Sequence, residues 1–178
     1  MNKVEHYRNI LKSLETWDAF LLQESGLPGP RANLELVQAA AEEGDESTFL
    51  RFLSFGPGEA PTNFPQEFLA VCGVVGLGRL VAEGKTGFLD LLRQCASDPR
   101  WRIREGVAMA LQRYGEANMD SLLQEMERWS LGSLLEKRAA AAALCEPKLL
   151  QKEAQVKRVL EILEQITESV SNVEDRKS

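Results

Sequence analysis

The feature that most constrains the fold of this sequence is the helical spacing of its apolar residues, which recurs without a competing strand signal. Near the N-terminus, apolar side chains follow one another at three- and four-residue steps from Val4 to Leu21, the spacing of one helix face. No run alternates β-branched and polar residues, and no Asn-Gly hairpin turn occurs. The chain is therefore predicted to be all-α, with one N-terminal helix within residues 1–26 that ends before the Pro-Gly-Pro stretch at 28–30.

Internal repetition is the second constraint. Two Glu-Gly breaks, at 43–44 and 83–84, each separate a helix rich in small residues from a short apolar helix. Leu77, Leu111 and Leu144 occupy equivalent places at offsets of 34 and 33 residues. Periods of this size with two helices per unit are typical of α-solenoids, and a generic helical bundle is the alternative. We expect one domain with helix pairs at 31–54, 64–97, 99–131 and 134–170 and a polar tail at 171–178.

Two local signals predict where helices begin. Asp98 and Pro99 indicate a helix start, because aspartate accepts hydrogen bonds from exposed N–H groups and proline suits the first helical position. Asn63 with Pro65 offers a similar, weaker start. Both lie at the beginning of a predicted pair.

The segment from Asp98 to Leu111 resembles a HEAT repeat. Its Asp-Pro is followed by an aliphatic-arginine pair, Ile103-Arg104, and by the closing dipeptide Ala110-Leu111. The resemblance extends less closely to 64–97 and 134–170, least to 31–54, and does not include the first helix. It implies a right-handed superhelix of helix pairs whose second helices line a concave surface, in a family that mostly binds proteins.

One branch of that family, the HEAT-like alkylpurine DNA glycosylases, holds DNA in a basic concave groove with aromatic and acidic residues near the lesion. The unit at 99–131, with Trp101 and its neighbouring arginines, is similar in style to that branch. No full set of the branch's functional residues can be matched, so no catalytic residue is carried over. A shared fold does not by itself convey function.

Composition narrows the class of function. The chain has 178 residues, with 27 acidic and 21 basic side chains and a net charge of −6. Nucleic-acid binding requires cationic surface that displaces counterions from phosphates, so this balance disfavours a nucleic-acid partner. No apolar run approaches the roughly 18–20 residues that cross a bilayer, and the N-terminus lacks the apolar core of a signal peptide. A cytoplasmic protein without a membrane partner is expected.

Residues for catalysis or metal binding are sparse. His6 is the only histidine and has no recognisable nucleophile beside it, so triad chemistry is not indicated. Cys72, Cys95 and Cys145 lack CxxC spacing, which argues against a zinc site, and all three are expected to be buried in helices. No catalytic residue, metal or cofactor is predicted, and a non-enzymatic role is favoured. Three glycines fit neither GxGxxG nor the Walker pattern and are expected to allow close helix packing: Gly73, Gly76 and Gly78.

The candidate ligand-binding surface is made of arginines and tryptophans in the third unit: Arg100, Trp101, Arg104, Arg113 and Trp129. Arg100 and Arg104 share a helix face and could contact phosphate or a carboxylate-bearing partner. Alternatively, Arg104 pairs with a neighbouring repeat and Trp101 packs between units. We expect a scaffold that binds a protein or peptide on its concave face, with a DNA-binding or DNA-repair protein as the alternative.

Overall fold

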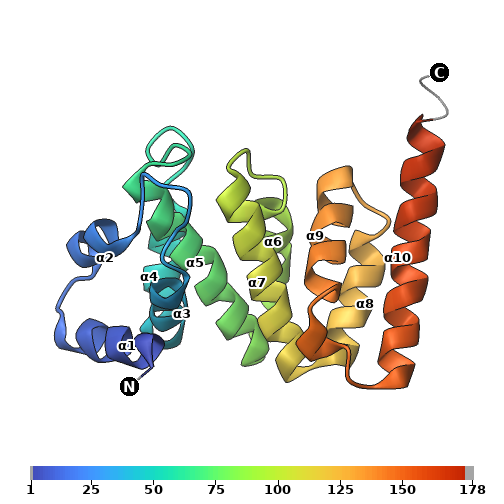
Figure 1. Ribbon diagram of the computed structural model, residues 1–178, viewed down its shortest axis with the longest axis horizontal. Helices are drawn as coiled ribbons and strands as arrows, with labels where there is room; N and C mark the ends of the chain where they lie inside the picture. Colours follow the sequence, from blue (N-terminus) through green and yellow to red (C-terminus); the bar gives the residue numbers. More distant parts are fainter. Residues whose placement is uncertain (1, 175–178) are drawn as a thin grey trace.

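The protein is all-α. The computed structural model describes the backbone of residues 2–174, which contains ten α-helices, two short 3-10 helices and no strand (Figure 1). The predicted polar tail at 171–178 begins inside the last helix, and residues 175–178 lie outside the described range. The elements are α1 (Lys3–Ser13), α2 (Asp18–Glu24), α3 (Leu34–Glu43), α4 (Glu46–Leu53), α5 (Pro65–Ala82), η1 (Thr86–Phe88), α6 (Leu89–Cys95), α7 (Trp101–Ala117), α8 (Met119–Trp129), α9 (Leu134–Leu144), η2 (Pro147–Leu149) and α10 (Glu153–Glu174).

The expectation of one N-terminal helix is wrong, because the segment forms the two helices α1 and α2. The chain turns after Ser13, and the indole N–H of Trp17 donates to the carbonyl of Leu11, 3.0 Å away. That carbonyl belongs to the last turn of α1 and also accepts from the backbone N–H of Leu14, so the indole is a second donor at the helix end. The apolar spacing continues across the break, since Trp17 and Phe20 pack against the same core as α1. Periodicity alone therefore hides this turn.

The chain advances along the long axis of the molecule, from α1 and α2 at one end to α10 at the other (Figure 1). α5 packs against both α3 and α7, and α7 packs against α9. α4 packs chiefly against α5, although only two residues separate it from α3, and α6 packs against α5 and α7. α8 contacts α7, α9 and α10. Each predicted unit contains two helices, but the strongest contact of α4 crosses from the first unit to the second.

α5 is the central helix of the core. By length and composition alone, this helix could cross a membrane, and the sequence was not expected to contain such a helix. Inside the structure, 78% of the helix is buried. Its glycines allow close packing, as predicted. A Cβ on Gly76 would lie 2.2 Å from the Phe49 ring of α4, and a Cβ on Gly78 would lie 2.4 Å from Cα of Ala110 in α7. Neither glycine is available to hold a phosphate.

One predicted helix start is displaced, that of α7, whereas α5 begins at Pro65 as predicted. α7 begins at Trp101 with Arg100 at its N-cap, and the N-cap makes no side-chain hydrogen bond. Asp98 instead accepts from the backbone N–H and the guanidinium of Arg100. α5 begins at Pro65, while Asn63 precedes it with a positive φ of 68°. Neither polar residue caps its helix, because Asp98 binds Arg100 two residues away and Asn63 accepts from the backbone N–H of Gly29 in the loop before α3.

Candidate ligand groove

Two adjoining hollows lie on the face formed by α3, α5, α7 and α9, and we call them together the groove. They share Met109 and Gln112 of α7 as lining residues. The first, the Trp101 hollow, has a volume of about 510 Å³, and the second, the Arg113 hollow, has a volume of about 720 Å³. The groove therefore runs over helices from all four predicted units.

The Trp101 hollow is predominantly apolar. Trp101 stands at the first position of α7 with 44% of its surface exposed, and the guanidinium of Arg102 lies 4.3 Å from its ring centroid. Arg31 and Glu105 supply charge at the hollow, and Glu105 pairs with Arg138 of α9. An apolar side chain could lie against the indole with its polar ends at these charges. The apolar lining comprises Pro30, Ala32, Leu34, Val71, Gly106, Ala108, Met109 and Ala142.

The Arg113 hollow carries both signs of charge. Arg113 donates to Glu42 at 2.7 Å and also to Gln38, and both partners belong to α3. Arg79 donates to the carbonyls of Ala41 and Gly44, each at 2.6 Å. These two guanidinium groups are therefore committed to holding helices together. The charged lining residues are the carboxylates Glu42, Glu83, Glu116 and Glu146 and the cations Arg79, Arg113 and Lys148.

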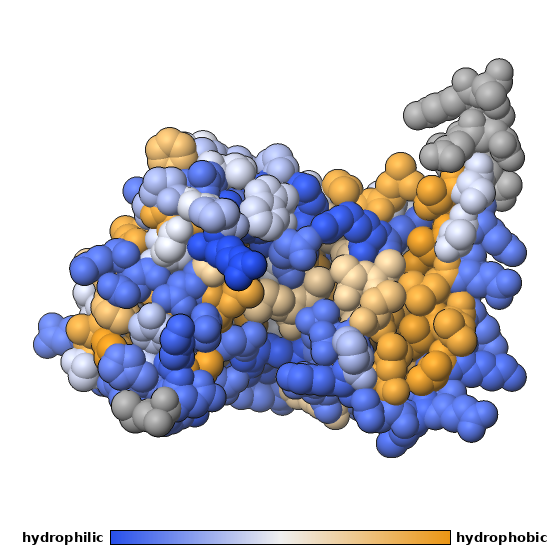
Figure 2. All heavy atoms as spheres, viewed as in Figure 1, coloured by the Kyte–Doolittle hydropathy of each residue, from blue (hydrophilic) through white to orange (hydrophobic). Residues whose placement is uncertain are grey.

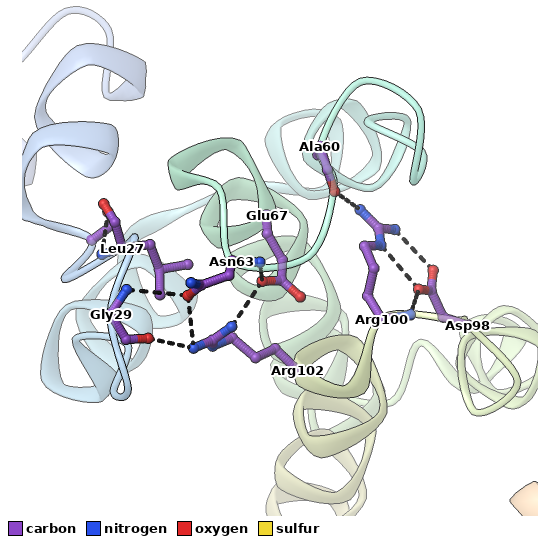
Figure 3. A network of polar contacts seen from close by, with 9 residues as sticks. Leu27, Gly29, Ala60, Asn63, Glu67, Asp98, Arg100 and Arg102 are labelled. Carbon is purple, nitrogen blue, oxygen red and sulfur yellow. Dashed lines mark hydrogen bonds and ion pairs between the residues drawn. The ribbon is translucent and has the colours of Figure 1, made fainter.

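Arg100 does not belong to a ligand-binding surface, because it is buried with 3% of its surface exposed. Its guanidinium pairs with both carboxylate oxygens of Asp98 at 2.8 and 2.9 Å and donates to the carbonyl of Ala60 (Figure 3). It also donates to the carbonyl of Phe55. Such fork-shaped pairing suits arginine in buried positions. Arg100 therefore connects the loop before α7 to the loop between α4 and α5.

Arg104 and Trp129 are placed by their own helices. Arg104 donates to the carbonyls of Asp98 and Pro99 at 2.7 and 3.0 Å. It therefore binds the segment just before its own helix, and not a neighbouring repeat as the alternative prediction had it. Trp129 is completely buried, and its indole N–H donates to Glu125 at 2.8 Å. The prediction that Trp129 belongs to a ligand-binding surface is wrong. Tryptophan is common at binding sites, but Trp129 also follows the apolar spacing of a core helix face, and it is part of the core.

Of the five predicted site residues, only Trp101 and Arg113 line the groove. Three further lining residues were not predicted from the sequence, Glu105, Met109 and Gln112, which lie on the same exposed side of α7 as Trp101 at three- and four-residue steps. The sequence could have indicated them as the residues of α7 that lie opposite its buried apolar stripe. Once Ile103, Val107, Ala110, Leu111 and Tyr114 are assigned to the core, the remaining face of α7 is defined.

The thiols and acidic groups of the described residues are candidate metal ligands and reactive groups. No group of three or more metal-ligating side chains occurs among the residues that the structure describes. Cys72 is fully buried, which raises the pKa of its thiol, and the partly buried Cys95 has a pKa raised by burial to about 11. Cys145 is exposed at the end of α9, contrary to the expectation that all three cysteines are buried. Cys72 and Cys95 therefore lack the thiolate character of reactive cysteines.

No family model matches the chain, and neither the search of curated proteins nor that of solved structures finds a match.

Proposed function

We propose that this protein is a non-enzymatic α-solenoid of the HEAT type that binds a protein segment or peptide in the groove, and that it acts in the cytoplasm. The observation that carries the proposal is the groove itself. It extends over consecutive core helices and places a half-exposed tryptophan beside an apolar hollow. Exposed aromatic anchors next to apolar pockets are typical of protein-binding surfaces.

The packing of α4 on α5, together with the helices that line the groove, supports a repeat register shifted by one helix from the predicted units. In this register the pairs are α4 with α5, α6 with α7, and α8 with α9, all of which are in contact. The HEAT-like segment from Asp98 to Leu111 then contains the start and the first part of α7, the second helix of its pair. The groove-lining helices α5, α7 and α9 become second helices, which is where the HEAT resemblance places the concave surface.

The chemistry of the groove favours a particular type of segment. The Trp101 hollow suits a large apolar side chain, because its lining is chiefly aliphatic and aromatic. The Arg113 hollow adds Glu116, which forms no ion pair among the described residues. A basic residue a few positions from the apolar anchor would meet this carboxylate. We infer a partner segment with an apolar anchor and a nearby lysine or arginine.

Two observations weigh against the alternative of a DNA-binding or DNA-repair protein. The Arg113 hollow has more carboxylates than cations, and its two arginines already bind protein acceptors. Trp129, one of the two tryptophans of the predicted ligand-binding surface, is buried. A polyanion would therefore find few free cations in the groove. The scaffold remains the better supported proposal.

A peptide selection tests the proposal. Peptides from a random library are selected on the immobilised wild-type protein and counter-selected on Ala142→Arg, which places a long cation in the Trp101 hollow. Enriched peptides should bind with micromolar affinity by fluorescence anisotropy and lose about tenfold or more on Trp101→Ala. Phe64→Ala is the matched control, since Phe64 is 56% exposed and does not line the groove.

The same assay distinguishes the alternative. A short duplex with an alkylated base is titrated at low and at moderate salt. Tight binding to the duplex with a steep salt dependence, together with no enriched peptide, would replace the scaffold proposal with the DNA-binding one. Peptides that bind Trp101→Ala and wild type equally would show that the groove is not the binding site.

A further inference from the structure

The last helix, α10, carries an apolar stripe that no other part of the described chain covers fully. Its inner stripe, Val159, Ile162 and Ile166, is buried on the side of α8 and α9. Beside this lies an outer stripe, of which Leu160 is 60% exposed and Val170 is 38% exposed. Figure 2 shows apolar surface gathered along α10 on the side toward α9. The outer stripe consists of four apolar residues and one threonine: Val156, Leu160, Leu163, Thr167 and Val170.

The spacing of the outer stripe is that of a helix-pairing seam. Its members follow one another at steps of four, three, four and three residues, from Val156 to Val170. This heptad pattern keeps one line of side chains facing a partner helix over about four turns. Single exposed leucines are common on protein surfaces, whereas a stripe of this length with four apolar side chains in five positions marks an interaction surface.

The far end of the stripe is extended by α9. Lys137 of α9 donates to Ser169 of α10 at 3.0 Å, so the start of α9 lies beside the end of α10. Leu134 and Leu135 at that start are 56% and 37% exposed. They add exposed apolar area where the stripe ends.

We propose that a second copy of this chain covers the stripe, with the two α10 helices antiparallel. Lys157 and Glu164 are both exposed on the outer flank of the seam, one heptad apart. When Leu160 faces Leu163 of the partner subunit, Lys157 lies across from the partner's Glu164. The twofold symmetry of the dimer repeats this pair in the opposite direction, so the interface contains two matched ion pairs.

A parallel arrangement lacks this match. In a parallel dimer, the flank that carries Lys157 and Glu164 would face the opposite flank of the partner helix. The corresponding positions on that opposite flank are Val159 and Ile166. These two side chains are buried within their own subunit and carry no charge. The charge pattern therefore selects the antiparallel dimer, although exposed ion pairs contribute little affinity compared with the apolar seam.

Sedimentation equilibrium of the full chain tests the proposal between about 1 µM and 1 mM. The wild type should shift with concentration from the 19.8 kDa monomer to twice that mass. Leu160→Glu should weaken association at least about 100-fold, because it places two charges in the seam. Phe64→Glu is the matched control, since Phe64 is 56% exposed and precedes α5, away from the stripe, and it should dimerise like the wild type.

A charge exchange tests the orientation. Lys157→Glu alone sets like charges opposite each other and should weaken the dimer several-fold, and Glu164→Lys alone should do the same. The double variant Lys157→Glu/Glu164→Lys should restore association to within about threefold of the wild type. A wild type that stays monomeric at the highest concentration overturns the proposal. So does a dimer that Leu160→Glu leaves intact, and failure of the double variant to recover overturns the antiparallel arrangement.

Discussion

Arg102 of α7 and Glu67 of α5 form an ion pair in the interior of the protein. Arg102 Nη1 lies 3.1 Å from Glu67 Oε2, and the two side chains are 7% and 0% exposed. The same carboxylate oxygen accepts from the backbone N–H of Asn63, and Arg102 also donates to the carbonyl of Gly29 (Figure 3). One buried arginine thus joins α7, the start of α5 and the loop before α3.

Removing one member of this pair should be costly. Arg102→Met leaves the Glu67 carboxylate buried without its cation and should lower the free energy of unfolding by about 3–5 kcal/mol. The double variant Glu67→Leu/Arg102→Met should cost clearly less than the sum of the single changes, because no uncompensated charge remains. Urea unfolding measures each variant.

The exposed pair of Arg138 and Glu105 provides the control for this prediction. Its side chains are 46% and 47% exposed, so Arg138→Ala should cost less than about 1 kcal/mol. If the two buried single changes prove additive, the coupling between Arg102 and Glu67 inferred from the structure is wrong.

Close packing of α4 on α5 predicts that Gly76→Ala is destabilising, although alanine is the better helix former. A Cβ at Gly76 would lie 2.2 Å from the ring of Phe49, which is fully buried. Overpacking of this kind costs about 1–3 kcal/mol, which exceeds the gain of about 1 kcal/mol in helix propensity. Gly56→Ala meets open space and should stay within about 0.5 kcal/mol of the wild type in a thermal melt. Equal melting of both variants would contradict the packing.

The all-α class followed from the sequence because apolar periodicity of three to four residues depends only on which residues a helix buries. The turn between α1 and α2 could not be predicted in this way. Trp17 and Phe20 pack on the same core on both sides of it, so the apolar pattern is uninterrupted. The partners of the helices were equally hidden, since the two-residue link between α3 and α4 does not reveal that α4 packs on α5.

The candidate site was harder to predict because residue type does not reveal burial. Arginine and tryptophan are common at binding surfaces, yet Arg100 and Trp129 are held inside by acceptors that lie close in three dimensions. Arg100 binds carbonyls 40 and 45 residues away, a relationship without a local pattern. Trp101 is the exception. It stands at the first position of α7, where few neighbouring side chains can cover it.

The capping box of α9 should make stability depend on acidic pH. Glu136 accepts from Arg93 Nε at 2.6 Å and from the backbone N–H of Ser133, and the hydrogen bond from Arg93 is the largest cause that lowers the pKa of Glu136. Since the folded pKa lies below the unfolded value of about 4.3, this stabilisation is complete above that pH. It is lost as the pH falls through the folded pKa.

Glu136→Gln should therefore be less stable than the wild type by about 1 kcal/mol near neutral pH, and the difference should shrink as the pH falls below the unfolded pKa of about 4.3. Urea unfolding at several pH values measures it. Arg93→Ala should move the carboxyl titration of Glu136, followed by NMR, toward its ordinary range. A difference between Glu136→Gln and wild type that is constant with pH would rule out this linkage.

The three cysteines report on the packing of three different helices. In the native protein at pH 8, an aromatic disulfide reagent should modify one thiol rapidly, that of the exposed Cys145. Cys95 should react slowly, because at a pKa of about 11 only about one thousandth of it is thiolate. Cys72 is fully buried in α5 and should react only when the core opens. Cys145→Ser should abolish the rapid phase, whereas Cys72→Ser should leave it unchanged. A second rapid equivalent in the wild type would mean that α6 or α5 opens far more readily than its packing implies.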